Sequence, residues 1–172
     1  MRTSTCDALA CRATLDSDSR STASSCSATA GGTWLSIEPA RFTLGGKPSC
    51  SVALSIDGRV RERFEVAPRR HGELVLPWAD ALLAEAGIAK SQLDAIAVGR
   101  GPGAFTGVRL AVAIAQGIAL ALDRPVVAVS TLAALAMRCD GASILAAIDA
   151  RMGEISRAAF TRDADGLVAP LG

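Results

Sequence analysis

Alternating apolar and polar positions between residues 49 and 66 predict two antiparallel strands. Ser49 to Ile56 (SCSVALSI) and Arg59 to Val66 (RVRERFEV) both alternate with a period of two. Asp57-Gly58 separates them, and this pair accepts the positive φ angles that a two-residue hairpin turn requires. In the second strand, alternate residues form one mostly apolar face, namely Val60, Glu62, Phe64 and Val66. The other face is charged, so this segment predicts a strand with one covered face.

After residue 66, segments with helical periodicity alternate with short segments typical of buried strands. Gly72 to Ala86 repeats its apolar residues at helical spacing, and Gly87 is placed to end that helix. Short continuous apolar runs predict strands buried on both faces: Asp94 to Val98, Val126 to Val129 and Ile144 to Ile148. Helices are expected over residues 107–122 and Leu132 to Met137, and an antiparallel strand over Arg157 to Thr161. This alternation predicts an α/β fold, and the hairpin makes its sheet mixed, with helices on the faces.

The first 33 residues differ in kind from the rest. They are rich in Ser, Thr, Ala and Cys and show neither helical nor strand periodicity. We therefore predict a disordered or non-native segment over residues 1–33 and a globular unit over residues 34–172. Three acidic residues, Asp7, Asp16 and Asp18, argue against a transit peptide.

Composition narrows the classes of function. A formal net charge of +1 argues against a free-standing nucleic-acid-binding domain. Five cysteines form no CxxC pair and there is one histidine, so we expect no metal site and reduced thiols in a cytoplasmic protein. The longest apolar run, Leu110 to Leu122, is shorter than a membrane-spanning helix needs, so no membrane association is expected.

A glycine-rich loop follows the strand that ends at Val98. Its defining residues are Gly101, Pro102, Gly103, Thr106 and Gly107. It lacks the GK[ST] ending of a P-loop and the spacing of a dinucleotide-binding fingerprint, so a structural turn is favoured over a phosphate cradle. Thr106 is the expected N-cap of the next helix, with Arg109 in its first turn. Arg100 and Arg109 flank the loop and are expected to be rim charges.

The helix over residues 107–122 (GVRLAVAIAQGIALAL) is apolar nearly all round. Arg109 and Gln116 are its polar side chains, so the helix should be covered on more than one face. The sheet can cover one face, and we expect a partner protein to cover the other. The candidate interface residues, from this helix and the one before it, are Leu74, Trp78, Leu82, Arg109, Leu110, Ala113, Ile114 and Gly117.

The segment GRGPGAFTGVRLAVAIAQGIALALDRPVVAVSTLAALA closely resembles the TsaB (YeaZ) family, in which a GPGSFTG-like loop leads into an apolar helix, a strand and an STLEAL-like helix. The flanking CSVALSIDGRVRERFEV and ILAAIDARMGEI also resemble that family, so the resemblance covers residues 49–160.

The resemblance implies an actin-like (ASKHA, ribonuclease-H-like) α/β domain and a non-catalytic role in making threonylcarbamoyladenosine (t6A) in tRNA. It implies a heterodimer with the catalytic TsaD subunit through the helices of residues 72–86 and 107–122. It also implies a TsaE-type ATPase as a further partner, tRNA contact through the complex, and a homodimer when the chain is alone. ATP and Mg²⁺ are then expected at the partner subunits, with no cofactor in this chain.

Two features depart from the family pattern. Family members open with a strand like LALDTST, whereas ARFTLGGKPS stands here before Cys50. Either Ser36 to Leu44 substitutes for that strand, or the N-terminus comes from a shifted frame or a wrong start. Family members also continue beyond residue 172 into a second lobe, so we expect a C-terminally truncated unit.

Few residues are candidates for catalysis. His71 is the single histidine and has no nucleophile near it in sequence, so we interpret it as part of a solvated helix start. Asp149 and Glu154 follow a predicted buried strand and are weak candidates for holding a nucleotide, against an ion pair with Arg151. We therefore predict no catalytic residue. The alternatives are an actin-like ATPase or kinase, a glycoprotease-like hydrolase and a non-functional fragment.

Overall fold

A five-stranded mixed sheet forms the larger part of the fold. The computed structural model describes residues 32–42, 48–66 and 70–171. The sheet has the order β3-β2-β1-β4-β5. Its strands are β1 (Thr33–Phe42), β2 (Pro48–Ile56), β3 (Arg59–Glu65), β4 (Ala95–Gly99) and β5 (Val126–Val129). The β1–β2 and β2–β3 pairs are antiparallel, and the β1–β4 and β4–β5 pairs are parallel. The predicted mixed sheet is confirmed.

The hairpin between β2 and β3 has the predicted turn. Asp57 and Gly58 have φ angles of 48° and 82°, as a two-residue turn that matches the twist of its strands requires. The ladder closes directly against this turn, with Ile56 opposite Arg59. The hairpin prediction is therefore confirmed in both strands and turn.

The central strand β1 comes from the segment that departs from the family pattern. Leu35 and Ile37 are fully buried in its middle, and they pair with Leu54 and Val52 of β2. A strand forms there, as the first alternative requires, and it starts earlier than Ser36, at Thr33. The alternative of a shifted frame or a wrong start stays a prediction. The prediction for residues 1–33 lies almost entirely outside the described residues.

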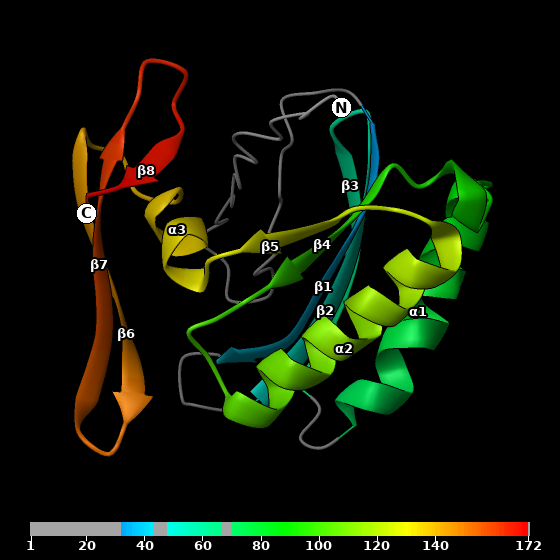
Figure 1. Cartoon of the computed structure of the whole chain (residues 1–172), viewed down its shortest axis with the longest axis horizontal. Coiled ribbons are helices and arrows are strands. Elements are labelled where there is room, and N and C mark those ends of the chain that lie inside the picture. Colours follow the sequence, from blue (N-terminus) through cyan, green and yellow to red (C-terminus); the bar gives the residue numbers. More distant parts are fainter. Residues whose placement is uncertain (1–31, 43–47, 67–69, 172) are drawn as a thin grey trace.

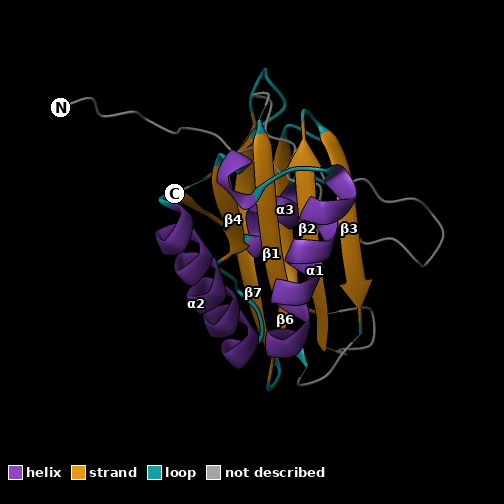
Figure 2. Ribbon diagram, turned by 90° about the vertical axis from the view of Figure 1, so that its right-hand side faces the viewer, coloured by secondary structure: helices purple, strands orange, loops and turns teal. Residues whose placement is uncertain are grey.

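Two long helices cover one face of this sheet (Figures 1 and 2). They are α1 (His71–Ala86) and α2 (Phe105–Leu122), with a short 3-10 turn at Lys90–Gln92 between α1 and β4. Gly87 ends α1 as predicted, with a φ of 70° and its N–H donating to the Ala84 carbonyl at 3.1 Å. Apolar side chains of β1, β2, β4 and the two helices make one core, including Ile37, Leu54, Val75, Ile96 and Ala115.

A second, smaller sheet follows in the chain. Its strands are β6 (Ser143–Arg151), β7 (Glu154–Arg162) and β8 (Val168–Pro170), paired antiparallel in the order β6-β7-β8. The predicted antiparallel strand at Arg157 to Thr161 is confirmed as part of β7. Helix α3 (Thr131–Ala136) packs on this sheet around a separate core of Leu132, Ala136, Ile144, Ala146 and Phe160. In Figure 1 this unit stands to one side of the larger sheet, next to β5.

Candidate functional site

The glycine-rich loop has a structural function in the fold. Gly101 is buried with a φ of 89°, and a Cβ there would lie 3.3 Å from the Gly103 nitrogen. Its carbonyl accepts a hydrogen bond from the Thr131 N–H at 2.9 Å, and the Arg100 N–H donates to the Val129 carbonyl at 2.9 Å. The loop thus ties β4 to β5 and α3 while turning the chain into α2. The interpretation of the loop as a structural turn stays a prediction.

Thr106 is not the N-cap of α2. The helix begins at Phe105, its N-cap residue is Ala104, and no side chain caps it. Thr106 lies one residue inside the helix and is exposed, whereas Gly107 is buried. The prediction failed because the loop ends two residues earlier than the residue types indicated.

Small residues form the buried stripe of α2. Gly107, Ala111, Ala115 and Ala119 recur every four residues and bring the helix close to β1 and β4. The opposite, exposed stripe consists of Phe105, Arg109, Ala113, Gln116 and Leu120. Among the described helices, α2 is the one with the length and apolar composition to cross a membrane. Its packing on the sheet along a full stripe is typical of a domain helix instead.

The residues of α1 divide into two sides. Gly72 lies against α2, since a Cβ there would be 3.8 Å from Leu110 Cδ2. Leu76 and Asp80 follow Gly72 at four-residue steps, so they lie on the side toward α2. Glu85 lies on the other side, where its carbonyl accepts a hydrogen bond from Arg61 at 2.7 Å and its carboxylate contacts Arg63. Thus one side of α1 faces α2 and the other faces β3.

The two sides of α1 and the burial of α2 show which of the predicted interface residues are open to a partner. Leu74 and Trp78 share a stripe with Glu85 and are half-buried on the β3 side of α1. Leu82 is 1% exposed and belongs to the core, so it is not available to a partner. Leu110 and Ile114 are half-buried, Leu110 against Gly72 of α1, whereas Arg109, Ala113 and Gly117 are exposed, as an interface residue must be.

We define the outer helical face as a set of apolar and small residues, together with Arg109, among those that α1 and α2 expose to solvent. Its members are Gly72, Leu76, Pro77, Phe105, Arg109, Ala113, Gly117 and Leu120. Leu76, Phe105 and Leu120 are 49%, 69% and 85% exposed, which is unusual for large apolar side chains on neighbouring helices. Sequence reasoning missed these three, although the small residues at four-residue spacing in α2 could have marked the buried stripe.

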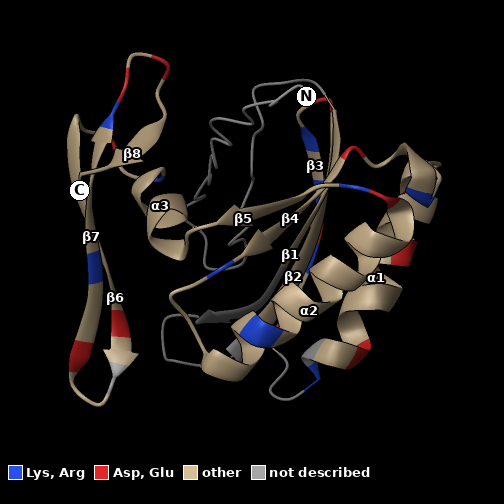
Figure 3. Ribbon diagram, in the orientation of Figure 1, with Lys and Arg blue, Asp and Glu red and all other residues tan. Residues whose placement is uncertain are grey.

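The charges around this face are few. Arg109 is the single charged residue of α2, visible as one blue band on that helix in Figure 3. Along the edge of α1, Asp80 pairs with Lys90 at 2.7 Å, and Glu73 pairs with Arg70 at 3.6 Å. The face is therefore largely apolar with Arg109 as its one cation, and it is bordered by the exposed Thr106 and Gln116 of α2 and by ion pairs along α1.

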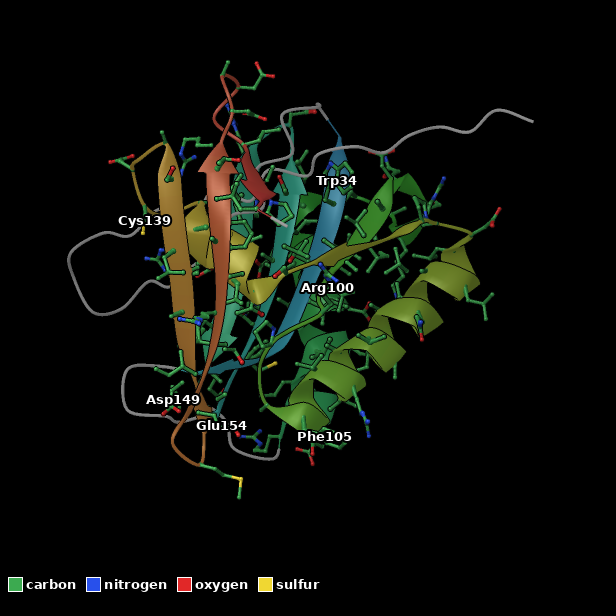
Figure 4. The ribbon with its side chains drawn as sticks, turned by 60° about the vertical axis from the view of Figure 1, so that its left-hand side comes forward. Trp34, Arg100, Phe105, Cys139, Asp149 and Glu154 are labelled. Carbon is green, nitrogen blue, oxygen red and sulfur yellow. The ribbon has the colours of Figure 1, made fainter. Side chains whose placement is uncertain are left out.

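Asp149 and Glu154 lie together at one end of the β6–β7 hairpin (Figure 4). Both are exposed, and in the ladder Asp149 is opposite Ile155 while Glu154 is opposite Arg151. Within the described part of the chain, no three His, Cys, Asp or Glu residues are grouped so that they could hold a metal ion. The side chain of His71 lies outside the described residues. This hairpin end offers carboxylates to solvent and encloses no described cavity.

Two cysteines are described, and both are free thiols. Cys50 is buried in the main core and Cys139 is exposed after α3. Burial and the nearby carboxylate of Glu65 raise the pKa of the Cys50 thiol to about 11. Cys50 is thus an apolar core residue at neutral pH, and Cys6, Cys11 and Cys26 lie outside the described residues.

Comparisons with known proteins point to one family. A family model described as "TsaD: tRNA N6-adenosine threonylcarbamoyltransferase" matches residues 64–167. The Escherichia coli (strain K12) "tRNA threonylcarbamoyladenosine biosynthesis protein TsaB" is 47% identical over 123 residues, which are 69% of this chain and 53% of that protein. A "tRNA N6-adenosine threonylcarbamoyltransferase" of Nitratidesulfovibrio vulgaris (strain DP4) is 46% identical over 68 residues, 40% of this chain and 19% of the relative.

A solved structure agrees with these sequence relatives. The protein titled "YeaZ from Pseudomonas aeruginosa" superposes with a TM-score of 0.71 at 45% sequence identity, covering 82% of this chain and 65% of that one. The chain spans about half the length of the curated relatives it matches. The expected actin-like α/β fold is therefore confirmed.

Proposed function

The chain belongs to the TsaD-type family of tRNA threonylcarbamoylation proteins, among its TsaB (YeaZ) members, and on that premise we propose that it is an accessory subunit in t6A synthesis. The TsaD-type partner transfers the threonylcarbamoyl group to the adenosine next to the anticodon. This chain holds that subunit in a working conformation and performs no chemistry itself. It acts in the cytoplasm, where the partner complex meets tRNA.

The outer helical face carries this proposal. It brings Leu76 of α1 and Phe105 and Leu120 of α2 to solvent together with small residues that let another helix approach closely. A domain of this size rarely exposes such a surface unless a partner covers it. The TsaD-type subunit suits that role because the TsaD family model matches residues 64–167, which contain both α1 and α2, so that subunit is expected to have related helices.

The partner set follows from the same premise. We propose a heterodimer with the TsaD-type subunit, joined by a TsaE-type ATPase, with tRNA bound by the assembly and not by this chain alone. ATP and Mg²⁺ are bound at the partner subunits. The formal net charge of +1 supports this division, because a chain that bound tRNA by itself would need a concentrated basic surface.

Reconstituted t6A synthesis tests the proposal. Purified TsaD-type and TsaE-type subunits, tRNA and threonylcarbamoyl-adenylate are combined with and without this chain, and t6A is quantified by mass spectrometry of digested tRNA. We expect t6A only when the chain is present, and none from the chain alone.

Two variants separate the accessory function from the ATPase alternative. Asp149→Ala and Glu154→Ala should keep the t6A rate within about twofold of the unmodified chain, since both side chains are exposed on the β6–β7 hairpin and neither belongs to the outer helical face. ATP binding by the isolated chain that is lost in Asp149→Ala would instead support an actin-like ATPase.

A further inference from the structure

Arg109 and Phe105 form a stacked pair on the exposed stripe of α2. The guanidinium carbon of Arg109 lies 3.6 Å from the centroid of the Phe105 ring, four residues back along the helix. Phe105 remains 69% exposed, so the ring supports the cation without burying it. Such a pair holds the arginine in one orientation on the helix surface, by an attraction typically worth about 0.5–1 kcal/mol at exposed sites.

The guanidinium edge is left available. None of the described residues makes an ion pair or hydrogen bond to Arg109 in this chain. Stacking engages the flat face of a guanidinium, whereas its five N–H donors lie in the plane and point outward. On the neighbouring helix α1, the carboxylates of Glu73 and Asp80 are already paired with Arg70 and Lys90.

Its surroundings favour a carboxylate as the binding group. Arg109 is the one charge of α2, with Ala113 one turn further along the helix. An oriented guanidinium among apolar groups is suited to a two-pronged hydrogen bond with a single carboxylate. A phosphate backbone would call for several unpaired cations, whereas Arg109 is the one charged residue of α2 and the charges of Glu73 and Asp80 along α1 are paired with Arg70 and Lys90.

We propose that Arg109, oriented by Phe105, anchors the partner subunit by binding an aspartate or glutamate on an otherwise apolar helical surface. This inference rests on the proposed function, because it assumes that a protein partner covers the outer helical face. It assigns the pair a distinct role: apolar contacts provide most of the buried area, and the arginine fixes the register of the two helical surfaces.

Binding of the purified TsaD-type subunit to variants of the full chain tests the proposal. Dissociation constants are measured by isothermal titration calorimetry at low and at high ionic strength. Arg109→Gln should weaken binding by roughly tenfold and flatten its dependence on salt, because the charge pair is lost. Arg157→Gln, which removes an exposed arginine from β7, is the matched control and should leave both quantities unchanged.

A double-mutant cycle tests the part played by the ring. Phe105→Leu should weaken binding by roughly threefold, and less so when Arg109 is already glutamine, because the ring acts through the guanidinium. Additive losses would contradict the proposed support of Arg109 by Phe105. Melting temperatures of all variants should stay close to that of the unmodified chain, since both side chains are exposed.

The outcomes separate this inference from the proposed function. Binding of Arg109→Gln within about twofold of the unmodified chain would overturn the anchor while leaving the accessory function intact. If Arg109→Gln bound the subunit normally but weakened tRNA binding by the assembly, the group recognised would be a phosphate and the proposal would be wrong. Absence of any complex with the unmodified chain would remove the proposed function itself.

Discussion

Gly117 lies on the exposed side of α2 with no heavy atom within 4 Å of where a Cβ would stand. Nothing in the described chain therefore requires a glycine there, and a glycine in mid-helix costs stability because of its backbone freedom. Close approach of a second helix is a physical reason for having a glycine at this position. At Gly117, therefore, the stability of the isolated chain favours a larger residue, whereas close packing of a partner helix favours glycine.

Gly117→Ala should stabilise the isolated chain by about 1 kcal/mol, because alanine favours the helix and meets no neighbour. For a chain of this size that corresponds to a rise in Tm of about 3 °C, which differential scanning calorimetry measures.

Gly87→Ala is the matched control. Its Cβ would also meet nothing within 4 Å, but its φ is +70°, so alanine there should destabilise by about 1 kcal/mol. Equal effects of the two substitutions would mean that Gly117 is not the open helical position that the structure places there.

Cys50 gives a pH-dependent contribution to stability. Its pKa is raised from an ordinary value near 9 to about 11 by burial and then by Glu65, so the folded state keeps the proton that the unfolded state loses. This stability is complete below pH 9 and is lost as the pH rises toward 11, by at most about 1.4 kcal/mol per pH unit. Urea unfolding between pH 8 and 11 measures it.

Cys50→Ala provides the comparison for that prediction. The variant should show a flatter decline of unfolding free energy above pH 9, whatever its stability at neutral pH. Every other titratable side chain is the same in the two proteins, so the difference between their pH slopes reports the Cys50 thiol alone. Identical pH slopes for the two proteins would contradict a raised pKa at Cys50.

For individual strands and helices, the sequence predicted which residues share a face, but it did not predict which neighbouring element that face meets. The alternation of β3 separated Arg59, Arg61, Arg63 and Glu65 from Val60 and Phe64, with Glu62 as the charged residue on the apolar side. It did not show that the charged side faces α1, where Arg61 and Arg63 reach Glu85 near the end of that helix. Carbonyl groups at a helix end attract cationic donors, and only the assembled layers show which strand supplies them.

The candidate interface shows the same limit. Helical spacing identified Leu74, Trp78 and Leu82 as apolar positions of one helix but could not tell a core stripe from an outer one. Leu82 proved to be core, and Leu76, between them in sequence, proved to be exposed. Which apolar stripe faces the sheet depends on tertiary packing, and the pattern of one helix alone does not contain that information.

The loop before α2 sets where that helix starts, and Gly101 should be the position most sensitive to change. Gly101→Ala combines a φ of +89° with a contact of 3.3 Å to the Gly103 nitrogen. We expect a loss of roughly 2 kcal/mol in unfolding free energy, measured by urea denaturation.

Gly58→Ala isolates the backbone part of that loss. It has a comparable φ of +82° but no atom within 4 Å, so it should cost less than Gly101→Ala. A Gly101→Ala loss no greater than that of Gly58→Ala would show that the loop can shift without strain.

The molecule as a whole has two hydrophobic cores, one under each sheet, and the core of the larger sheet is covered more completely. In the larger sheet the first strand, β1, pairs on both edges, with β2 and β4. In the smaller sheet β6 pairs with β7 alone among the described strands, and Leu145 and Ile155 are 68% exposed on its outer surface. The larger unit contains α1 and α2 and therefore the outer helical face, the surface through which we propose that the chain binds its partner subunit.

Size-exclusion chromatography with light scattering, on this chain mixed with a purified TsaD-type subunit, tests that claim most directly. We predict a one-to-one complex that survives Ala164→Glu, a charge on the exposed β7–β8 turn. The complex should be lost in Gly117→Glu, at an exposed position where a Cβ would meet no atom within 4 Å. A folded chain that forms no complex, or a complex indifferent to Gly117→Glu, would contradict the proposed binding of the TsaD-type subunit through the outer helical face.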